Sequence, residues 1–218
     1  MKNKFIKIKL VVFDLDDTLT IGPTIWELVH QEKGTWHSHG LPYYQAFQRG
    51  QFGFNAFIRK DVACWAGLEV TRLNKAIKKI RHQSGLKKTI LALKKLGVKT
   101  AIISSGLDYF AQAVARKFKI DYHFANHLLI KNRCLTGKIN LKVAGGGKGR
   151  MLRKIKSKLK IKKGEILAVG DSSFDLPMFR EAGIKISFKD ADKTIKKMAD
   201  FILSKNNIFR LVSIIKSI

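Results

Sequence analysis

Residues 10–20 read LVVFDLDDTLT, a short apolar run followed by three aspartates. The run at 10–13 holds no polar side chain, which predicts a strand buried on both faces of a parallel sheet. In open α/β sheets, ligands bind beyond the carboxyl ends of such strands. Asp14 and Asp16 are therefore candidates for reactive groups. Two carboxylates in a loop remain a weak signal by themselves.

Strand and helix patterns alternate through the second part of the chain. The pattern predicts an α/β fold with a Rossmann-like, three-layer core around a parallel sheet, built from residues 1–20 and 86–218. The predicted helices are 89–96, 109–118, 149–159 and 176–182; the predicted strands are 98–104, 122–124, 166–169 and 184–187; a hairpin or flap is predicted at 128–138, and a closing strand and helix after Asp200.

Residues 21–85 differ from this alternation because large aromatic residues recur at helical spacing and no strand signal appears. The pattern predicts an inserted helical cap. Helical spacing of large apolar groups is typical of a small bundle interior, so these aromatic residues are predicted to be core rather than ligand contacts.

A second acidic pair follows the predicted strand 166–169, where Gly170 and Asp171 are followed by Asp175. If this strand neighbours the first one, Asp14 and Asp171 lie side by side and offer oxygen ligands suited to Mg²⁺. The alternative is a turn followed by a helix N-cap, which uses the same residue types.

Two further segments fit phosphate chemistry. Ser104, Ser105 and Gly106 end a predicted strand, where a hydroxyl and backbone N–H groups can hold phosphate oxygens. Lys148 lies among glycines at the start of a predicted helix and can stabilise negative charge on a transferring group.

In this order and at these spacings, the four segments resemble the haloacid dehalogenase superfamily, and most of all its phosphoserine phosphatase group. The superfamily pattern is Asp-x-Asp-x-Thr, a Ser or Thr after a later strand, a Lys on a helix, and Gly-Asp-x-x-x-Asp. The resemblance covers essentially the whole chain and implies a Mg²⁺-dependent phosphatase acting on a small phosphorylated metabolite.

The resemblance also implies a role for each matched residue. Asp14 would be the nucleophile and a Mg²⁺ ligand, and Asp16 the general acid and base, with its backbone carbonyl also on the metal. Asp171 would ligate the metal and Asp175 would orient the metal's surroundings. The remaining roles are phosphate binding by Ser104, Ser105 and Gly106, and charge neutralisation by Lys148.

Three positions depart from the phosphoserine phosphatase pattern. The family's acidic residue that meets the substrate amino group falls at about Pro23, and its arginine that meets the carboxylate falls near Asp61, beside Arg59 and Lys60. Phe174 stands where the group has asparagine, so an aromatic wall is expected at the substrate. We therefore predict a substrate other than phosphoserine, with a less polar body.

Composition and charge indicate which partners and which compartment to expect. The net charge of +27 fits either a polyanion-binding surface or solvated helix faces, and the absence of a nucleic-acid motif favours the latter. No apolar run is long enough for a membrane span, and only two cysteines are present, so we expect a cytoplasmic protein without disulfides.

His37 and His39 are interpreted as part of a polar loop rather than a metal site.

The motifs are also compatible with two other functions. A phosphotransferase or mutase would use the same motifs, because Asp14 can pass its phosphoryl group to an alcohol instead of water. A polyanion-binding protein with secondary catalysis is the other alternative. The sequence predicts no oligomeric state.

Overall fold

The computed structural model describes residues 7–204 and 207–218, and its centre is a seven-stranded sheet in the order β6-β5-β4-β1-β7-β8-β9. All neighbours pair in parallel except β5 and β6. The strands are β1 (Leu10–Phe13), β4 (Lys99–Leu107), β5 (Tyr122–Lys131), β6 (Cys134–Asn140), β7 (Ile166–Val169), β8 (Ile184–Phe188) and β9 (Phe201–Leu203). The Rossmann-like prediction is confirmed.

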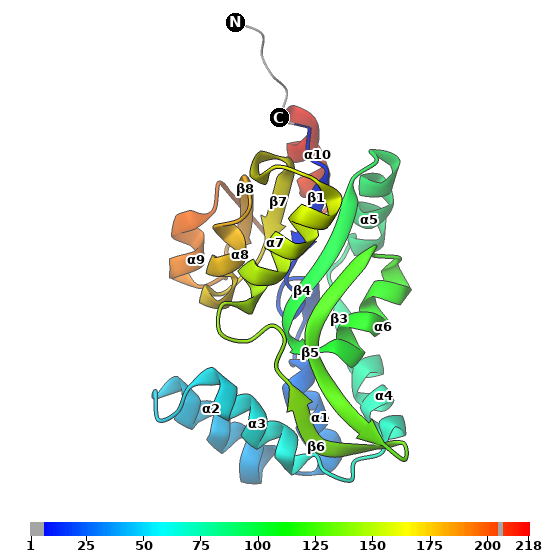
Figure 1. Cartoon of the computed structure of the whole chain (residues 1–218), viewed down its shortest axis with the longest axis vertical. Helices are drawn as coiled ribbons and strands as arrows, with labels where there is room; N and C mark the ends of the chain where they lie inside the picture. Colours follow the sequence, from blue (N-terminus) through cyan, green and yellow to red (C-terminus); the bar gives the residue numbers. More distant parts are fainter. Residues whose placement is uncertain (1–6, 205–206) are drawn as a thin grey trace, which may run out of the picture.

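Helices on both faces of the sheet complete three layers (Figure 1). They are α5 (Leu86–Lys95), α6 (Asp108–Phe118) and α10 (Arg210–Ser217) on one side, and α7 (Gly147–Leu159), α8 (Leu176–Phe179) and α9 (Lys193–Met198) on the other. Every residue of β1 and β7 is buried, which explains why both strands lack polar side chains. The carboxyl ends of these strands face α1, α2 and α3 (Figure 1).

The segment between β2 (Thr20–Ile21) and β3 (Arg81–His82) is helical, and we call its helices the cap helices. They are α1 (Ile25–Lys33), α2 (Leu41–Gln48), α3 (Phe54–Cys64) and α4 (Val70–Lys79), with a π-helical turn at Trp36–Gly40. The expectation that this region holds no strand is wrong, because β2 and β3 pair antiparallel at its base. Two-residue strands are too short to show an alternating pattern.

The division into a core (1–20 and 86–218) and a cap (21–85) stays a prediction, and residues 1–6 of that core lie outside the described residues. The chain enters the cap helices from β2 and leaves them through β3.

The predicted hairpin exists, and its first strand is the continuation of the core strand β5. β5 pairs with β4 at its start and with β6 at its end, so it runs well past the predicted 122–124. The chain reverses through Asn132 and Arg133, whose φ angles are 49° and 60°. Backbone bonds of 2.8 and 2.9 Å join Leu135 to Leu68 and Gly67, so the hairpin is fastened to the cap helices.

Two further expectations can be compared with the described residues. Neither Cys64 nor Cys134 forms a disulfide. Within residues 7–204 and 207–218, no helix is both long and apolar enough to cross a membrane.

Candidate active site

The central strands bring three carboxylates together. β1 and β7 are neighbours with Phe13 opposite Val169, and the Asp14 N–H donates to the Val169 carbonyl at 2.9 Å. Asp14 and Asp171 therefore leave adjacent strands at the same edge of the sheet. One carboxylate oxygen of each of Asp14, Asp171 and Asp175 lies within 4.8 Å of the others. The predicted convergence of the two motifs is confirmed.

Asp175 fixes the turn after β7. Its Oδ2 accepts from the backbone N–H groups of Asp171 (3.0 Å) and Ser172 (3.2 Å), and it is completely buried. Position 170 must be glycine, because a Cβ there would lie 2.6 Å from the Asp175 carboxylate. Asp175 therefore holds the loop that carries Asp171 in place through these two hydrogen bonds.

Lys148 lies between two of these carboxylates. Its Nζ is 2.7 Å from Asp14 Oδ1 and 2.5 Å from Asp175 Oδ1, and the side chain is 4% exposed. Burial alone lowers the pKa of Lys148, but the charges of Asp14 and Asp175 outweigh it and raise that pKa. Lys148 is therefore a fixed cation. The predicted glycine-rich helix start is also confirmed, since Gly146 caps α7 with φ 78°.

The pKa values of Asp14 and Asp171 are raised by burial and by their mutual repulsion with Asp175. Burial raises the pKa of Asp14, and the neighbouring Asp175 charge adds to this against the opposing pull of Lys148. Burial and Asp175 likewise raise the pKa of Asp171 to about 7. Three carboxylates facing one buried lysine leave negative charge uncompensated. Oxygen donors with spare negative charge fit Mg²⁺, so the residues present suit this ion.

Asp16 is held apart from this set and faces the cap helices. Its Oδ1 accepts from the Ile25 N–H at 3.4 Å, at the start of α1. The chain turns sharply after it, since Asp17 has a left-handed φ of 56°. Burial raises the pKa of Asp16 to about 6, against the opposing hydrogen bond from Ile25. Such a carboxyl exchanges protons readily near neutral pH.

The end of β4 carries the predicted phosphate-binding residues. The strand continues beyond the predicted 104, with an irregularity between Ile103 and Leu107. Ser104 is buried, and its Oγ accepts from the Gly106 N–H at 2.9 Å. A Cβ at Gly106 would lie 3.1 Å from both Ser104 Oγ and Asp16 Oδ2. Glycine therefore lets these two polar groups approach each other.

Three supporting residues were missed by sequence reasoning. Thr18 donates to Asp171 Oδ1 at 2.7 Å, and Gln83 donates to the Thr18 carbonyl at 2.7 Å. Asn126 donates to the Ser105 carbonyl (2.7 Å) and accepts from the Val143 N–H (2.9 Å). The position of Thr18 inside its motif was the available signal. Gln83 and Asn126 act through long-range contacts that no local pattern encodes.

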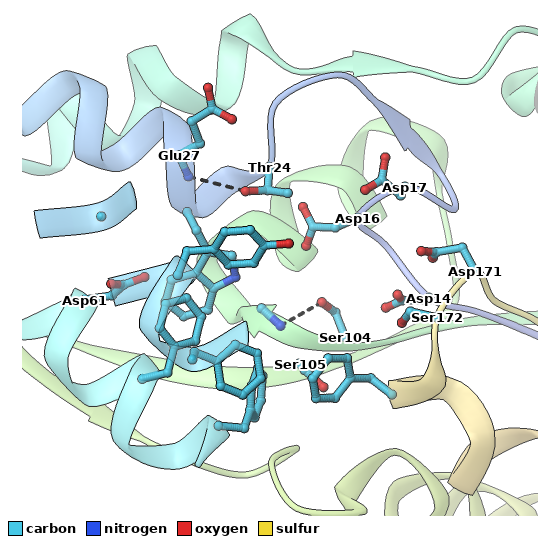
Figure 2. A pocket seen from close by; sticks show the side chains of 18 of the residues that line it. Asp14, Asp16, Asp17, Thr24, Glu27, Asp61, Ser104, Ser105, Asp171 and Ser172 are labelled. Atoms are coloured by element: carbon cyan, nitrogen blue, oxygen red, sulfur yellow. Dashed lines mark hydrogen bonds between the residues drawn. The ribbon is translucent and has the colours of Figure 1, made fainter. Parts of the chain in front are cut away.

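The acidic residues and the predicted phosphate-binding residues line a cavity of about 420 Å³ (Figure 2). Asp14, Asp16, Ser104, Ser105, Gly106, Lys148 and Asp171 all line it, together with Phe174, so the predicted site residues other than Asp175 surround one space. The Phe174 ring packs on Phe54 with centroids 4.7 Å apart. This contact joins the loop after β7 to α3.

The prediction that the cap aromatics are mainly core is only partly correct. Trp65 and Phe57 are buried, but Phe57 also lines the cavity. The cavity is further lined by Trp26, Trp36, Tyr44, Phe47 and Phe54. Helical spacing shows that a face is apolar without showing whether another helix or a ligand covers it.

His37 and His39 lie in the π-helical turn rather than in a polar loop. Within the described part of the chain, the residues grouped closely enough to hold a metal ion are Asp14, Asp171 and Asp175, and neither histidine belongs to that group.

Fold and site together define a Rossmann-like α/β protein with a cluster of carboxylates and one buried lysine at the carboxyl ends of its central strands. Residues 8–183 match the model of the haloacid dehalogenase-like hydrolases. The chain is 34% identical over 211 residues to a phosphoserine phosphatase of Methanocaldococcus jannaschii, covering 96% of this chain and 99% of that one. It is also 34% identical to a phosphoserine phosphatase of Archaeoglobus fulgidus, but spans 60% of that protein.

Solved structures agree with these relatives. A substrate-bound phosphoserine phosphatase complex superposes with a TM-score of 0.85 at 31% identity, covering 95% of this chain and 98% of the other. A phospho-aspartyl intermediate analogue of a phosphoserine phosphatase gives 0.84 at 32% identity, with coverages of 95% and 99%. The chain belongs to the haloacid dehalogenase-like hydrolases, in the group that resembles phosphoserine phosphatases, and it is a phosphoric monoester hydrolase.

Proposed function

We propose that the chain hydrolyses a small phosphomonoester other than phosphoserine, with Asp14 as nucleophile and Mg²⁺ as cofactor. The observation that carries the chemistry is the pair Asp14 and Asp171 at the ends of neighbouring strands, with the buried Lys148 of α7 against Asp14. In this proposal Asp14, Asp171 and the Asp16 carbonyl hold the metal, and Asp175 orients Asp171. Bound Mg²⁺ would supply positive charge to the phosphoryl oxygens.

Each residue then has a defined task. Asp14 attacks phosphorus and carries the phosphoryl group, while Lys148 keeps the Asp14 carboxylate charged and oriented. Asp16, with a pKa raised to about 6 by burial, protonates the leaving oxygen and afterwards takes a proton from water. Ser104 and the N–H groups of Ser105 and Gly106 bind the phosphoryl oxygens.

The substrate proposal rests on the cavity's charge. Among the described residues that line it, Lys148 is the one lysine or arginine, and it already contacts two carboxylates. Arg59 and Lys60 are exposed and do not line the cavity. Asp61 lines it instead, which is unfavourable for the carboxylate of phosphoserine.

A panel of phosphomonoesters assayed with and without Mg²⁺ tests the proposal. We expect Mg²⁺-dependent release of phosphate, a loss of at least about 10³-fold in kcat for Asp14→Asn, and poor turnover of phosphoserine. Turnover retained in Asp14→Asn would overturn the chemistry. Phosphoserine outperforming all other esters would overturn the substrate proposal alone.

A small phosphorylated metabolite in the cytoplasm is the setting that this proposal assumes. The net charge of +27 would attract such anions without requiring nucleic acid as a partner.

A further inference from the structure

The cavity has two chemically different parts. Its phosphoryl side is formed by Asp14, Asp16, Ser104, Lys148 and Asp171. Its other side is mostly aromatic and carries two carboxylates, those of Glu27 and Asp61. Figure 2 shows Asp61 on the opposite side of the view from Asp14, Asp16 and Asp171, with ring-bearing side chains between them. A molecule that fills the cavity therefore carries a phosphate at one end and meets rings and Asp61 at the other.

Asp61 is a buried acid that contacts one histidine through a long ion pair. It lies on α3, is 1% exposed, and its Oδ1 has no hydrogen-bond partner among the described residues. His30 Nε2 lies 3.4 Å from Asp61 Oδ1, a distance too long for a good hydrogen bond but short enough for an ion pair when His30 is protonated, and His30 Nδ1 is hydrogen-bonded to Thr35. A buried carboxylate whose only charged neighbour in the described part of the chain is this histidine is stabilised further by a second positive charge placed near it.

The rings that line the cavity contact one another and form a continuous wall. Phe47 stacks on Phe57 with centroids 5.1 Å apart, Tyr44 lies 6.2 Å from Phe57, and Phe174 lies 6.3 Å from Phe47. Aromatic faces attract organic cations, and the attraction grows when water is excluded. A carboxylate behind such a wall adds charge complementarity for a cation and opposes an anion.

Glu27 also lines the cavity, but its carboxylate is already hydrogen-bonded elsewhere. Its carboxylate accepts from Gln31 at 3.0 Å. Figure 2 shows that carboxylate pointing away from Asp16 and Ser104, with the backbone N–H directed to Thr24 instead. Asp61 is therefore the acid on the aromatic side to which a substrate cation would be drawn.

We propose that the substrate is the phosphomonoester of a small amino alcohol that lacks a carboxylate, with its ammonium group seated among the aromatic rings and facing Asp61. This inference rests on the phosphatase function proposed above and names its substrate class. Asp61 and the aromatic rings are then specificity determinants. Phosphoserine is rejected because its carboxylate would enter a pocket that holds a carboxylate and no unpaired cation.

Matched substrates separate charge from shape. Phosphocholine and 3,3-dimethylbutyl phosphate have nearly the same shape, but only the first carries a positive charge. Phosphoethanolamine and phosphoserine differ by one carboxylate. For the unmodified protein we expect kcat/KM to favour phosphocholine over the neutral ester by about tenfold or more, and phosphoethanolamine over phosphoserine by at least as much.

The decisive quantity is the phosphocholine-to-neutral-ester ratio of kcat/KM in each variant. Asp61→Asn keeps the size of the side chain and removes its charge, so the ratio should fall to near one. Tyr44→Leu removes an exposed ring of the wall and should lower the ratio in part. Glu181→Gln removes a carboxylate outside the cavity, where it pairs with Arg153, and should leave the ratio unchanged.

The possible failures are distinguishable. If no ester is hydrolysed with Mg²⁺, the proposed function itself is wrong. If neutral esters are hydrolysed and the unmodified protein shows no preference for the ammonium esters, this inference is wrong and the phosphatase function stands. If Asp61→Asn does not fold, as judged by circular dichroism, an unchanged ratio in Tyr44→Leu contradicts the role of the aromatic wall.

Discussion

At the scale of single residues, Lys148 is the group on which the acidic site depends. It is the cation between Asp14 and Asp175, and all three side chains are buried. A buried charge without its partner is strongly destabilising. The contact that orients Asp14 in the proposed mechanism therefore also stabilises the fold.

Lys148→Met should lower the stability to unfolding by about 3 kcal/mol, because Asp14 and Asp175 then lack a counter-charge. Urea unfolding in the presence of a metal chelator measures this. The double variant Lys148→Met/Asp175→Asn should recover part of the loss, since one of the unpaired charges is gone. Equal stabilities for the unmodified protein and Lys148→Met would contradict the electrostatic role.

His82, at the base of the cap helices, is a second residue with a measurable consequence. Burial, assisted by the Lys117 charge, lowers the pKa of His82 to about 4 from the ordinary 6.5. Between these values the unfolded chain binds a proton that the folded chain does not. Stability therefore falls as the pH decreases from 6.5 towards 4.

His82→Gln removes this titration and should reduce that fall. The measurement is the unfolding midpoint at several pH values between 4 and 7 for both proteins. The remaining acid sensitivity, which comes from the carboxylates, is common to the two and serves as the reference. Identical pH profiles would show that His82 is not held neutral in the folded state.

At the scale of elements, the position of α7 against α8 sets the position of Lys148. A Cβ at Gly149 would lie 2.6 Å from the Pro177 carbonyl oxygen, which belongs to α8. Gly164 precedes β7 and has no atom within 4 Å of such a Cβ. The two glycines therefore form a matched pair for testing how close the helices must be.

Gly149→Ala should destabilise the protein by about 1–3 kcal/mol and reduce kcat, because α7 must move away from α8 and carries Lys148 with it. Gly164→Ala should change neither quantity appreciably. Thermal unfolding and a steady-state assay with any accepted ester provide both readings. A fully active, equally stable Gly149→Ala would show that the helix spacing is not critical.

The same elements explain how far the sequence predicts the structure. The strand at 166–169 was predicted with its correct bounds because its apolar run is short and ends at Gly170. β2 and β3 were missed because each has two residues and exists only through pairing with the other. The start of β5 was predicted, but its continuation depends on β6, which local patterns do not reveal.

For the candidate site, too, residues in local motifs were predicted and residues that act through distant contacts were not. Asp14, Lys148 and Asp171 were found because each lies at a strand end or helix start with a recognisable motif. Gln83 and Asn126 were not assigned, since they act on the site through contacts distant in sequence. The aromatic wall of the cavity was predicted at Phe174 but not for the rings of the cap helices, because burial by protein and burial by a ligand demand the same residue types.

At the scale of the whole molecule, the net charge of +27 should affect capture of substrate rather than chemistry. We expect kcat/KM for a doubly charged phosphomonoester to fall as ionic strength rises from low salt to about 0.15 M, where the screening length is about 8 Å. The value of kcat should stay constant. Retained binding of RNA or DNA at that salt would instead support a polyanion partner.

The central claim concerns Asp14, and trapping the phosphorylated enzyme tests it most directly. Rapid quenching during turnover, followed by borohydride reduction, converts an aspartyl phosphate to homoserine, which peptide mass spectrometry can locate. We expect homoserine at position 14, in a fraction that requires both Mg²⁺ and substrate. Modification at another aspartate, or none at position 14 while phosphate is being released, would contradict the account.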